Sequence, residues 1–218
     1  MNFTDFLQNQ LDPLMLDSSI FEALEIMEMH NLSHFPIVDN NVYLGSLPLE
    51  DIYDLDNRKT VHDVNYLWQS FFVREQPSWL ELYEIFSKYK ATVIPVLNDE
   101  NHYCGYYIFE DINQQFMQMP LFKEYGIILE IEHNIHKYSL SQVSQIVESN
   151  NGKLLGAFVT DMNDDRIRLT LKFTSTYIND TIQTFRRYEY LIITDHTEDQ
   201  LIEELKDRSN YLDKYLNL

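Results

Sequence analysis

The hydrophobic and polar positions of the chain follow two kinds of pattern, which change near residue 120. Before that point, short apolar runs alternate with amphipathic segments of helical spacing. The expected helices span about residues 3–11, 19–30, 78–89 and 110–119, with another starting at 48–52. The expected strands span about residues 14–16, 35–38, 42–47, 71–73, 92–97 and 103–108. The first half is therefore predicted to mix helices and short strands.

After Met119 and Pro120 the pattern is that of longer strands with one buried face. Strands are expected over residues 126–133, 153–160, 166–174 and 190–194, with helices over 139–150 and 179–187. The order strand, helix, strand, strand, helix, strand is ferredoxin-like. A last amphipathic helix is expected over 198–216, packed on the domain that precedes it or across a dimer.

An internal repeat organises the first half. Pro36 and Pro95 lie 59 residues apart, and Gly45 and Gly105 lie 60 apart. A Ser-x-x-Glu capping box, in which each side chain satisfies a free amide at a helix start, begins at 19 and again at 78. Because there are only two copies of a long unit, the repeat indicates a pair of small domains with a shared core rather than a solenoid.

Each copy resembles a cystathionine-β-synthase (CBS) domain, whose tandem pairs form the Bateman module. The family pattern is a hydrophobic-x-hydrophobic-Pro strand, followed by Gly-hydrophobic-hydrophobic-Ser/Thr-x-x-Asp. Copy one matches at residues 33–36 and 45–51, and copy two matches at 92–95 and 105–111. The resemblance implies a CBS pair over residues 1–118, with copies at about 13–57 and 70–118.

The fold class expected for the whole chain is α+β, a CBS pair followed by a ferredoxin-like domain over residues 122–218. Behind a CBS pair, this βαββαβ order looks like an ACT domain. The ACT family usually places a glycine in the loop after its first strand, and residues 133–138 contain none. The combination resembles the acetoin-utilisation accessory proteins of the AcuB type.

The resemblance also implies a ligand cleft. In CBS pairs that bind adenosine nucleotides, the backbone before the strand proline lines the base, and the Ser/Thr and Asp of the second motif hold phosphate and ribose. The candidate ligand-binding residues are therefore His34, Phe35, Pro36, Asp51, Val93, Ile94, Pro95, Ile108 and Asp111. The Ser/Thr positions depart from the pattern, because Pro48 and Ile108 offer no hydroxyl. As helix N-caps, Asp51 and Asp111 would instead have a structural role.

Charge favours copy two for any anionic ligand. Residues 1–57 hold eleven acidic side chains and no Lys or Arg. A phosphate in copy one would need counter-charge from the other half, from backbone amides or from a metal. Copy two has Arg74, Lys88 and Lys90 nearby in sequence, so the ribose of AMP, ADP or ATP is expected to meet Asp111 more than Asp51.

Composition excludes several function classes. A net charge of -19 argues against nucleic acids and anionic membranes as partners. Cys104 is the single cysteine, so no internal disulfide is expected, and no apolar run approaches the roughly 18 residues of a membrane span. The N-terminus lacks a signal-peptide pattern. We therefore expect a soluble, cytoplasmic protein.

The sequence contains no common catalytic motif and only five glycines, so a phosphate-cradling loop has little material. His133 and His136 lack the partners of a metal site, so no metal is expected. We expect a non-catalytic regulatory protein that binds a small metabolite, forms a homodimer through its many aromatic residues, and acts on a protein partner. The alternatives are a scaffold that has lost its ligand site and, more weakly, an unrecognised enzyme.

Overall fold

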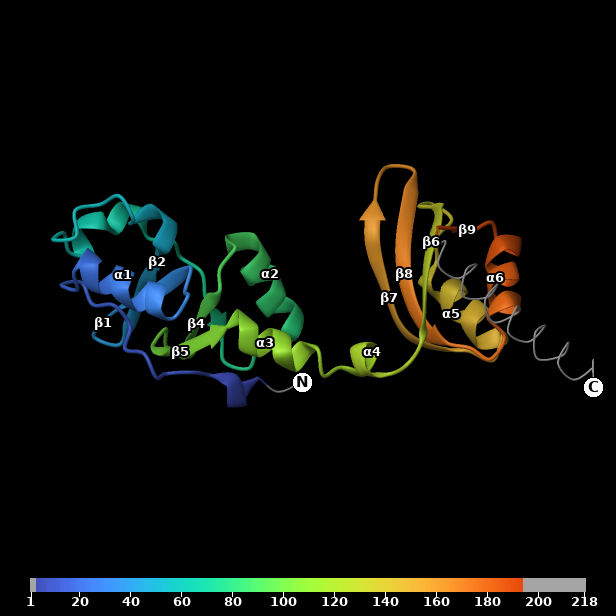
Figure 1. Cartoon of the computed structure of the whole chain (residues 1–218), viewed down its shortest axis with the longest axis horizontal. Coiled ribbons are helices and arrows are strands. Elements are labelled where there is room, and N and C mark those ends of the chain that lie inside the picture. The colour runs from blue at the N-terminus through green and yellow to red at the C-terminus, as the bar shows by residue number, and fades with distance from the viewer. Residues whose placement is uncertain (1–2, 194–218) are drawn as a thin grey trace, which may run out of the picture. The chain divides into compact units, whose positions relative to one another are not determined.

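The computed structural model describes residues 3–193. They form two compact units, and the chain passes from the first to the second between Gln118 and Met119 (Figure 1). Both units combine helices with antiparallel strands, which confirms the predicted α+β class. The helix expected over 198–216 lies outside the described residues. Within residues 3–193, no helix is both long enough and apolar enough to span a bilayer.

The first unit holds two small sheets, one for each copy of the repeat. Strands β1 (His34–Asp39) and β2 (Val42–Pro48) form an antiparallel hairpin. The second sheet contains β3 (Val73–Arg74), β4 (Val93–Leu97) and β5 (Tyr103–Ile108). The helical elements are η1 (Thr4–Phe6), α1 (Ile20–Met29), η2 (Leu49–Asp51), η3 (His62–Leu67), α2 (Trp79–Tyr89) and α3 (Phe109–Phe116).

The repeat appears in the structure as matched hydrogen bonds between the copies. The amide of Ser33 donates to Thr92 Oγ1 at 2.9 Å, and the amide of Thr92 donates to Ser33 Oγ at 2.8 Å. Within each copy there is a further matched bond, from the amide of Leu49 to the carbonyl of Ser33 and from the amide of Phe109 to the carbonyl of Thr92, each at 2.8 Å. Because every bond has a counterpart 59 or 60 residues away, the copies are related by an approximate two-fold axis that passes between Ser33 and Thr92.

The two copies also exchange extended segments. Gln8, which precedes copy one, exchanges two backbone hydrogen bonds of 2.9 Å with Tyr106 of copy two. Gln69, which precedes copy two, does the same with Ser46 of copy one at 2.7 and 2.9 Å. The helix expected over 3–11 is therefore wrong beyond Phe6, because the backbone of Gln8 is used in strand-like pairing instead.

The predicted helix caps are confirmed in part. Ser19 and Glu22 form a complete capping box, and Ser78 accepts a hydrogen bond from the amide of Glu81. Ser139 occupies the N-cap position of α5, but its side chain accepts no capping hydrogen bond.

The helix expected from Pro48 is only the single 3-10 turn η2. Asp51 is the last residue of that turn, and Asp111 is the third residue of α3, whose N-cap is Ile108. Neither aspartate is an N-cap, so that structural explanation for them is wrong.

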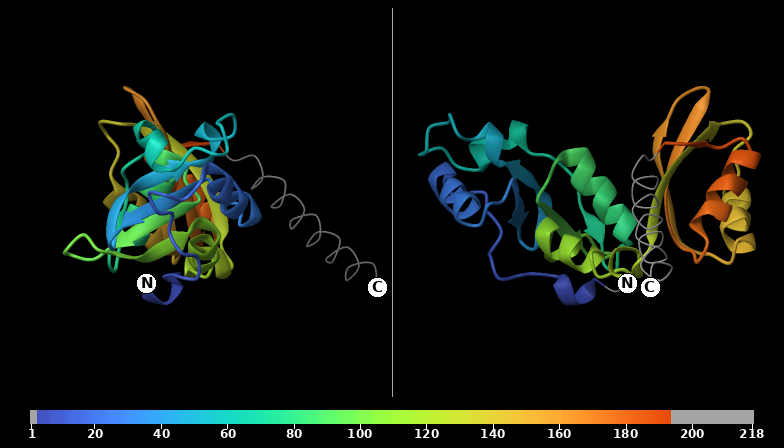
Figure 2. Two further views of the ribbon diagram at one scale, coloured as in Figure 1. Left: turned by 90° about the vertical axis from the view of Figure 1, so that its left-hand side faces the viewer. Right: turned by 45° about the vertical axis from the view of Figure 1, so that its right-hand side comes forward.

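The second unit contains a four-stranded antiparallel sheet in the order β7-β8-β6-β9, which is the ferredoxin-like order predicted from the sequence. The strands are β6 (Ile127–Asn134), β7 (Lys153–Met162), β8 (Arg166–Thr174) and β9 (Leu191–Ile192). The helices are α4 (Pro120–Lys123), α5 (Leu140–Ser149) and α6 (Ile178–Arg187). Figure 2 shows α5 and α6 together on one face of this sheet.

Alternation along β6 and β8 creates the core of the second unit. Leu129 and Ile131 are fully buried, whereas Ile128, which directly precedes Leu129 in the strand, is 58% exposed. The inward side chains of β8 join them against α5 and α6. The predicted one-sided burial is therefore confirmed for these strands, while β9 is shorter than the strand expected over 190–194.

Candidate functional site

A pocket of about 240 Å³ lies in the first unit and takes its walls from both copies of the repeat. Copy one contributes Ser33, His34, Leu49, Glu50 and Tyr53, and copy two contributes Tyr89 and Lys90. The pocket is thus built at the approximate two-fold axis, next to the hydrogen bonds that join Ser33 and Thr92.

Local backbone geometry brings these side chains together. His34 is the first residue of β1 and stands between Ser33, which bonds to Thr92, and the apolar residues 35–38. Glu50 lies in the η2 turn that follows β2. Lys90 is the C-cap of α2 and has a φ of 50°, a left-handed conformation that ends the helix. The end of α2 therefore places Tyr89 and Lys90 against the β1 and η2 residues of copy one.

His34 is the most buried polar residue of the pocket, with only 5% of its surface exposed. Its Nδ1 lies 2.9 Å from Ser33 Oγ in a hydrogen bond. Burial lowers the pKa of the imidazole, and the side chain of Gln69 and the charges of Glu50 and Asp51 oppose that shift. The ring is therefore neutral at pH 7 and contributes no charge to the pocket.

The structure brings only part of the predicted set to this pocket. Among the nine candidates, His34 lines it, whereas Phe35, Pro36, Val93, Ile94 and Pro95 are buried in β1 and β4. Ile108 packs against the core of copy one. Asp51 ends η2 beside the pocket residue Glu50, and Asp111 accepts a hydrogen bond from the side chain of Gln8.

The basic residues that favoured copy two are engaged elsewhere. Arg74 donates to the carbonyl of Asn98 and, at 2.7 Å, to Asn101 Oδ1. The ammonium of Lys88 lies 5.1 Å from the centre of the Tyr89 ring. Of these three, Lys90 lines the pocket described above, beside His34 and Glu50 of copy one. A counter-charge from the other half is therefore available to copy one, and the expected preference for Asp111 over Asp51 stays a prediction.

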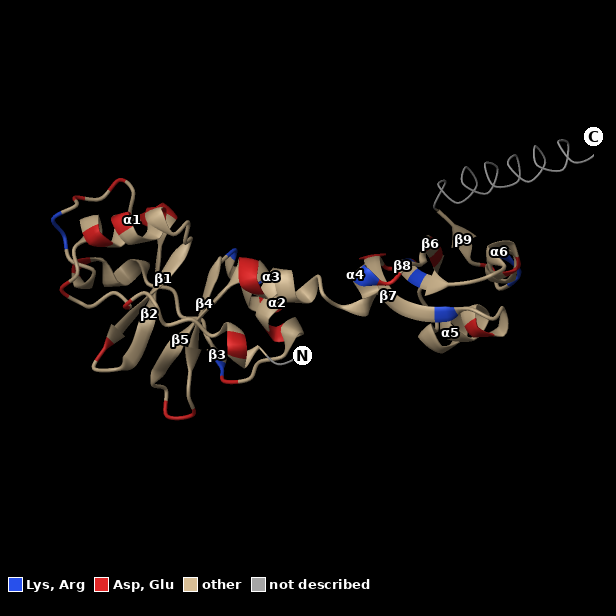
Figure 3. Ribbon diagram, turned by 60° about the horizontal axis from the view of Figure 1, so that its bottom comes forward, with Lys and Arg blue, Asp and Glu red and all other residues tan. Residues whose placement is uncertain are grey.

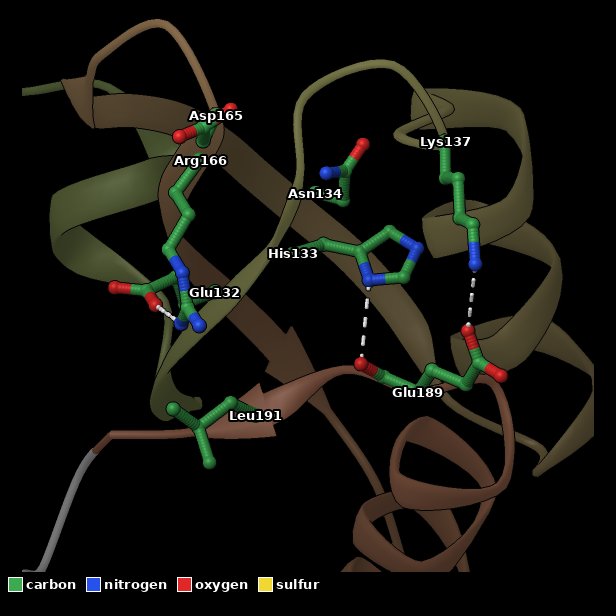
Figure 4. Close-up of a pocket in the computed structure, with 8 residues that line it drawn as sticks. All are labelled: Glu132, His133, Asn134, Lys137, Asp165, Arg166, Glu189 and Leu191. Atoms are coloured by element: carbon green, nitrogen blue, oxygen red, sulfur yellow. Dashed lines mark hydrogen bonds and ion pairs between the residues drawn. The ribbon is translucent and has the colours of Figure 1, made fainter.

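A second, larger pocket of about 520 Å³ lies in the second unit, at the ends of β6 and β9 (Figure 4). Four of its charged side chains already form two ion pairs, Lys137 with Glu189 at 3.1 Å and Arg166 with Glu132. His133 Nδ1 donates to the carbonyl of Glu189 at 3.2 Å. A ligand here would compete with these existing bonds, so the pocket of the first unit is the stronger candidate.

His133 and His136 are not part of a metal centre in the described structure. His133 stacks on Tyr190 with ring centroids 4.3 Å apart. Across residues 3–193, no cluster of three or more His, Cys, Asp or Glu side chains could hold a metal ion.

Comparison with known proteins agrees with the repeat. Residues 11–57 match the family model described as the CBS domain. No curated protein matches the chain. Similar solved structures include a CBS domain pair/ACT domain protein from Thermotoga maritima, with 18% identity and a TM-score of 0.48, over 54% of this chain and 98% of that one.

Two further similar structures cover a similar share of the chain. The CBS domains of a transcriptional regulator from Streptococcus pneumoniae have 14% identity and a TM-score of 0.46, over 52% of this chain and 98% of that one. CBSX2 in complex with AMP has 19% identity and a TM-score of 0.46, over 54% and 96%. Copy one is thus similar to a CBS domain along residues 11–57, and the reciprocal bonds between Ser33 and Thr92 pair it with a second copy of the same design.

Proposed function

We propose that this chain is a non-catalytic regulatory protein that binds a small metabolite in the pocket formed by both CBS-like copies. The observation that carries the proposal is the composition of the pocket wall, which joins β1 and η2 of copy one to the end of α2 in copy two. A ligand that contacts both copies stabilises one arrangement of them over others, and a partner protein can respond to that change.

The pocket offers groups suited to a flat ring that carries hydroxyls. Tyr53 and Tyr89 provide aromatic surface, and Glu50 provides carboxylate oxygens that can accept hydrogen bonds from ligand hydroxyls. An adenosine nucleotide or a related nucleoside is the ligand class that the CBS resemblance suggests. For the second unit we propose an ACT-like identity, which would give the chain an AcuB-type architecture. We further propose a cytoplasmic homodimer.

The proposal predicts that Tyr53→Ala weakens ligand binding without weakening the fold. Tyr53 is 54% exposed, so its removal costs little core packing. A ligand that binds only the folded state stabilises it by about 2.7 kcal/mol at a hundred times its Kd. Thermal unfolding of the intact chain with adenosine, AMP, ADP and ATP should show this stabilisation in the wild type and a smaller one in Tyr53→Ala.

Tyr66→Ala is the matched control, because Tyr66 is 69% exposed and is not among the residues that line the pocket. It should respond to ligand as the wild type does. Equal ligand-induced stabilisation in both variants would place binding elsewhere.

The alternative function is a scaffold without a ligand, and it has a specific observation in its favour. The hydroxyl positions of both motifs are Pro48 and Ile108, and the amides that follow them, those of Leu49 and Phe109, already donate to Ser33 and Thr92. If none of the four compounds raises the melting temperature or produces heat in calorimetry, the scaffold becomes the better proposal.

A further inference from the structure

The charges around the pocket of the first unit leave it slightly negative. Among its seven lining residues, Lys90 is the single cation and Glu50 is the single anion. The carboxylate of Asp51, like that of Glu50, lies near enough to act on His34, and His34 itself is neutral because burial lowers its pKa. Figure 3 shows acidic positions in red along the ribbon of α1, and the first basic residue of the sequence is Arg58, in the link after copy one. Each added negative charge on a ligand therefore meets repulsion.

The wall of this pocket is poor in the groups that usually hold phosphates, which are helix N-terminal amides, free hydroxyls and arginines. Its seven lining residues include no arginine, and the hydroxyl of Ser33 already bonds to Thr92 and His34. The η2 element is one 3-10 turn, and the amide of Leu49 at its start already donates to Ser33. Pro48 offers neither hydroxyl nor amide hydrogen. Arg58, the first arginine of the chain, is paired with Asp56 at 2.9 Å.

The volume of the pocket points to a small ligand. At about 240 Å³, it lies below the roughly 300–1,000 Å³ typical of pockets for drug-sized molecules. Two of its seven lining residues are tyrosines, so the space suits a flat ring with hydroxyls better than a long phosphate chain.

We infer that this pocket selects an uncharged, nucleoside-like ligand, a flat ring with a hydroxylated substituent, and discriminates against di- and triphosphates. The inference rests on the proposed function of the same pocket and specifies its ligand class. Selectivity comes from Glu50 and Asp51 together with the missing phosphate anchors, while Lys90 tolerates one phosphate.

Isothermal titration of the intact chain with adenosine, AMP, ADP and ATP, at low ionic strength and without magnesium, tests this inference. The Kd is expected to rise from AMP to ADP to ATP by about threefold for each added phosphate, with adenosine no weaker than AMP. Added salt should reduce these differences, because it screens the carboxylates.

Two charge variants and a matched control locate the cause of the selectivity. The ratio of the ATP Kd to the adenosine Kd should fall about threefold in Glu50→Gln and rise in Lys90→Gln. Glu110→Gln, at the matching position 60 residues later, should leave the ratio unchanged. Because both Kd values of the ratio are measured on the same variant, a general weakening of the pocket affects both equally and cancels.

The outcomes separate this inference from the proposed function. If ATP binds most tightly, or if Glu50→Gln leaves the ratio unchanged, the selectivity is wrong and the pocket remains a nucleotide site. If none of the four compounds binds, the proposed ligand class fails and the inference fails with it.

Discussion

At the scale of single residues, the burial of His34 links the stability of the first unit to pH. Burial lowers the pKa of its imidazole below the value of about 6.5 in the unfolded chain. The unfolded state therefore takes up a proton first as the pH falls. The stabilising contribution is complete above about pH 6.5 and is lost as the pH falls from there toward the lower pKa of the folded state. We expect the free energy of unfolding to decrease more between about pH 7.5 and 5.5 in the wild type than in His34→Asn.

Tryptophan fluorescence can measure this change in the intact chain, because Trp68 and Trp79 are the only tryptophans and both lie in the first unit. His30→Asn, at the exposed end of α1, controls for the removal of a histidine. Identical pH slopes in the wild type and His34→Asn would show that other groups dominate.

The residues of the pocket were only partly predictable from the sequence. His34 could be found because it stands two positions before Pro36 in the repeated motif. Tyr89 and Lys90 carry no local signal, since α2 ends far from the copy-one motif in sequence and reaches it only through the two-fold contact between copies. The sequence identifies Lys90 as a base near copy two, but only the fold shows that it also lies beside residues of copy one.

At the scale of elements, the two glycines that occupy the same position of the repeat, Gly45 and Gly105, have different backbone conformations and neighbours. Gly105 has a φ of 142°, and a Cβ there would overlap the carbonyl oxygen of Gln8. Gly45 has no such φ, and its Cβ would meet Trp68 Cβ at 3.1 Å. We expect Gly105→Ala to lower the free energy of unfolding by about 2 kcal/mol or more, because both the backbone and the Gln8 pairing are strained.

Gly45→Ala should cost about 1 kcal/mol or less, since the neighbouring side chain needs to give way by only a few tenths of an ångström. Urea unfolding followed by tryptophan fluorescence measures both variants on the same unit. Equal losses would mean that the exchanged segment of Gln8 contributes little to stability.

Element prediction succeeded where burial decides the pattern and failed where tertiary pairing competes with local preference. The alternation in β6 and β8 reports a single buried face, so these strands were predicted well. The spacing of Phe3, Phe6 and Leu7 fits one face of a helix. It fits equally well a segment that becomes extended and packs these side chains on copy two. The chain takes the second option because Gln8 gains two backbone hydrogen bonds with Tyr106.

At the scale of the whole molecule, acidic charge is concentrated in the first unit. The first 57 residues contain eleven acidic side chains without any Lys or Arg, and the ribbon of α1 in Figure 3 carries red, acidic positions and no blue, basic ones. Repulsion among these groups weakens the folded state most at low ionic strength. We expect the free energy of unfolding of the first unit to rise with sodium chloride up to about 0.3 M.

Tryptophan fluorescence reports the first unit, and the remaining change in far-ultraviolet circular dichroism serves as the internal comparison. The second unit should respond less to salt, because its described residues carry nearly balanced charges, nine acidic and eight basic over residues 119–193. Stability of the first unit that is flat or falls with salt would show that its carboxylates lie too far apart to repel.

The exchange of Gln8 and Gln69 between the copies has a consequence for how the first unit can be divided. If the chain is cut in the link near Asn57, the N-terminal fragment contains Gln8, which pairs with β5 of the other fragment. The C-terminal fragment contains Gln69, which pairs with β2 of the N-terminal fragment. Each piece then exposes an unpaired edge that only the other piece fills. Neither half is complete without the other, so two fragments made by this cut are expected to re-associate through the pairings of Gln8 and Gln69.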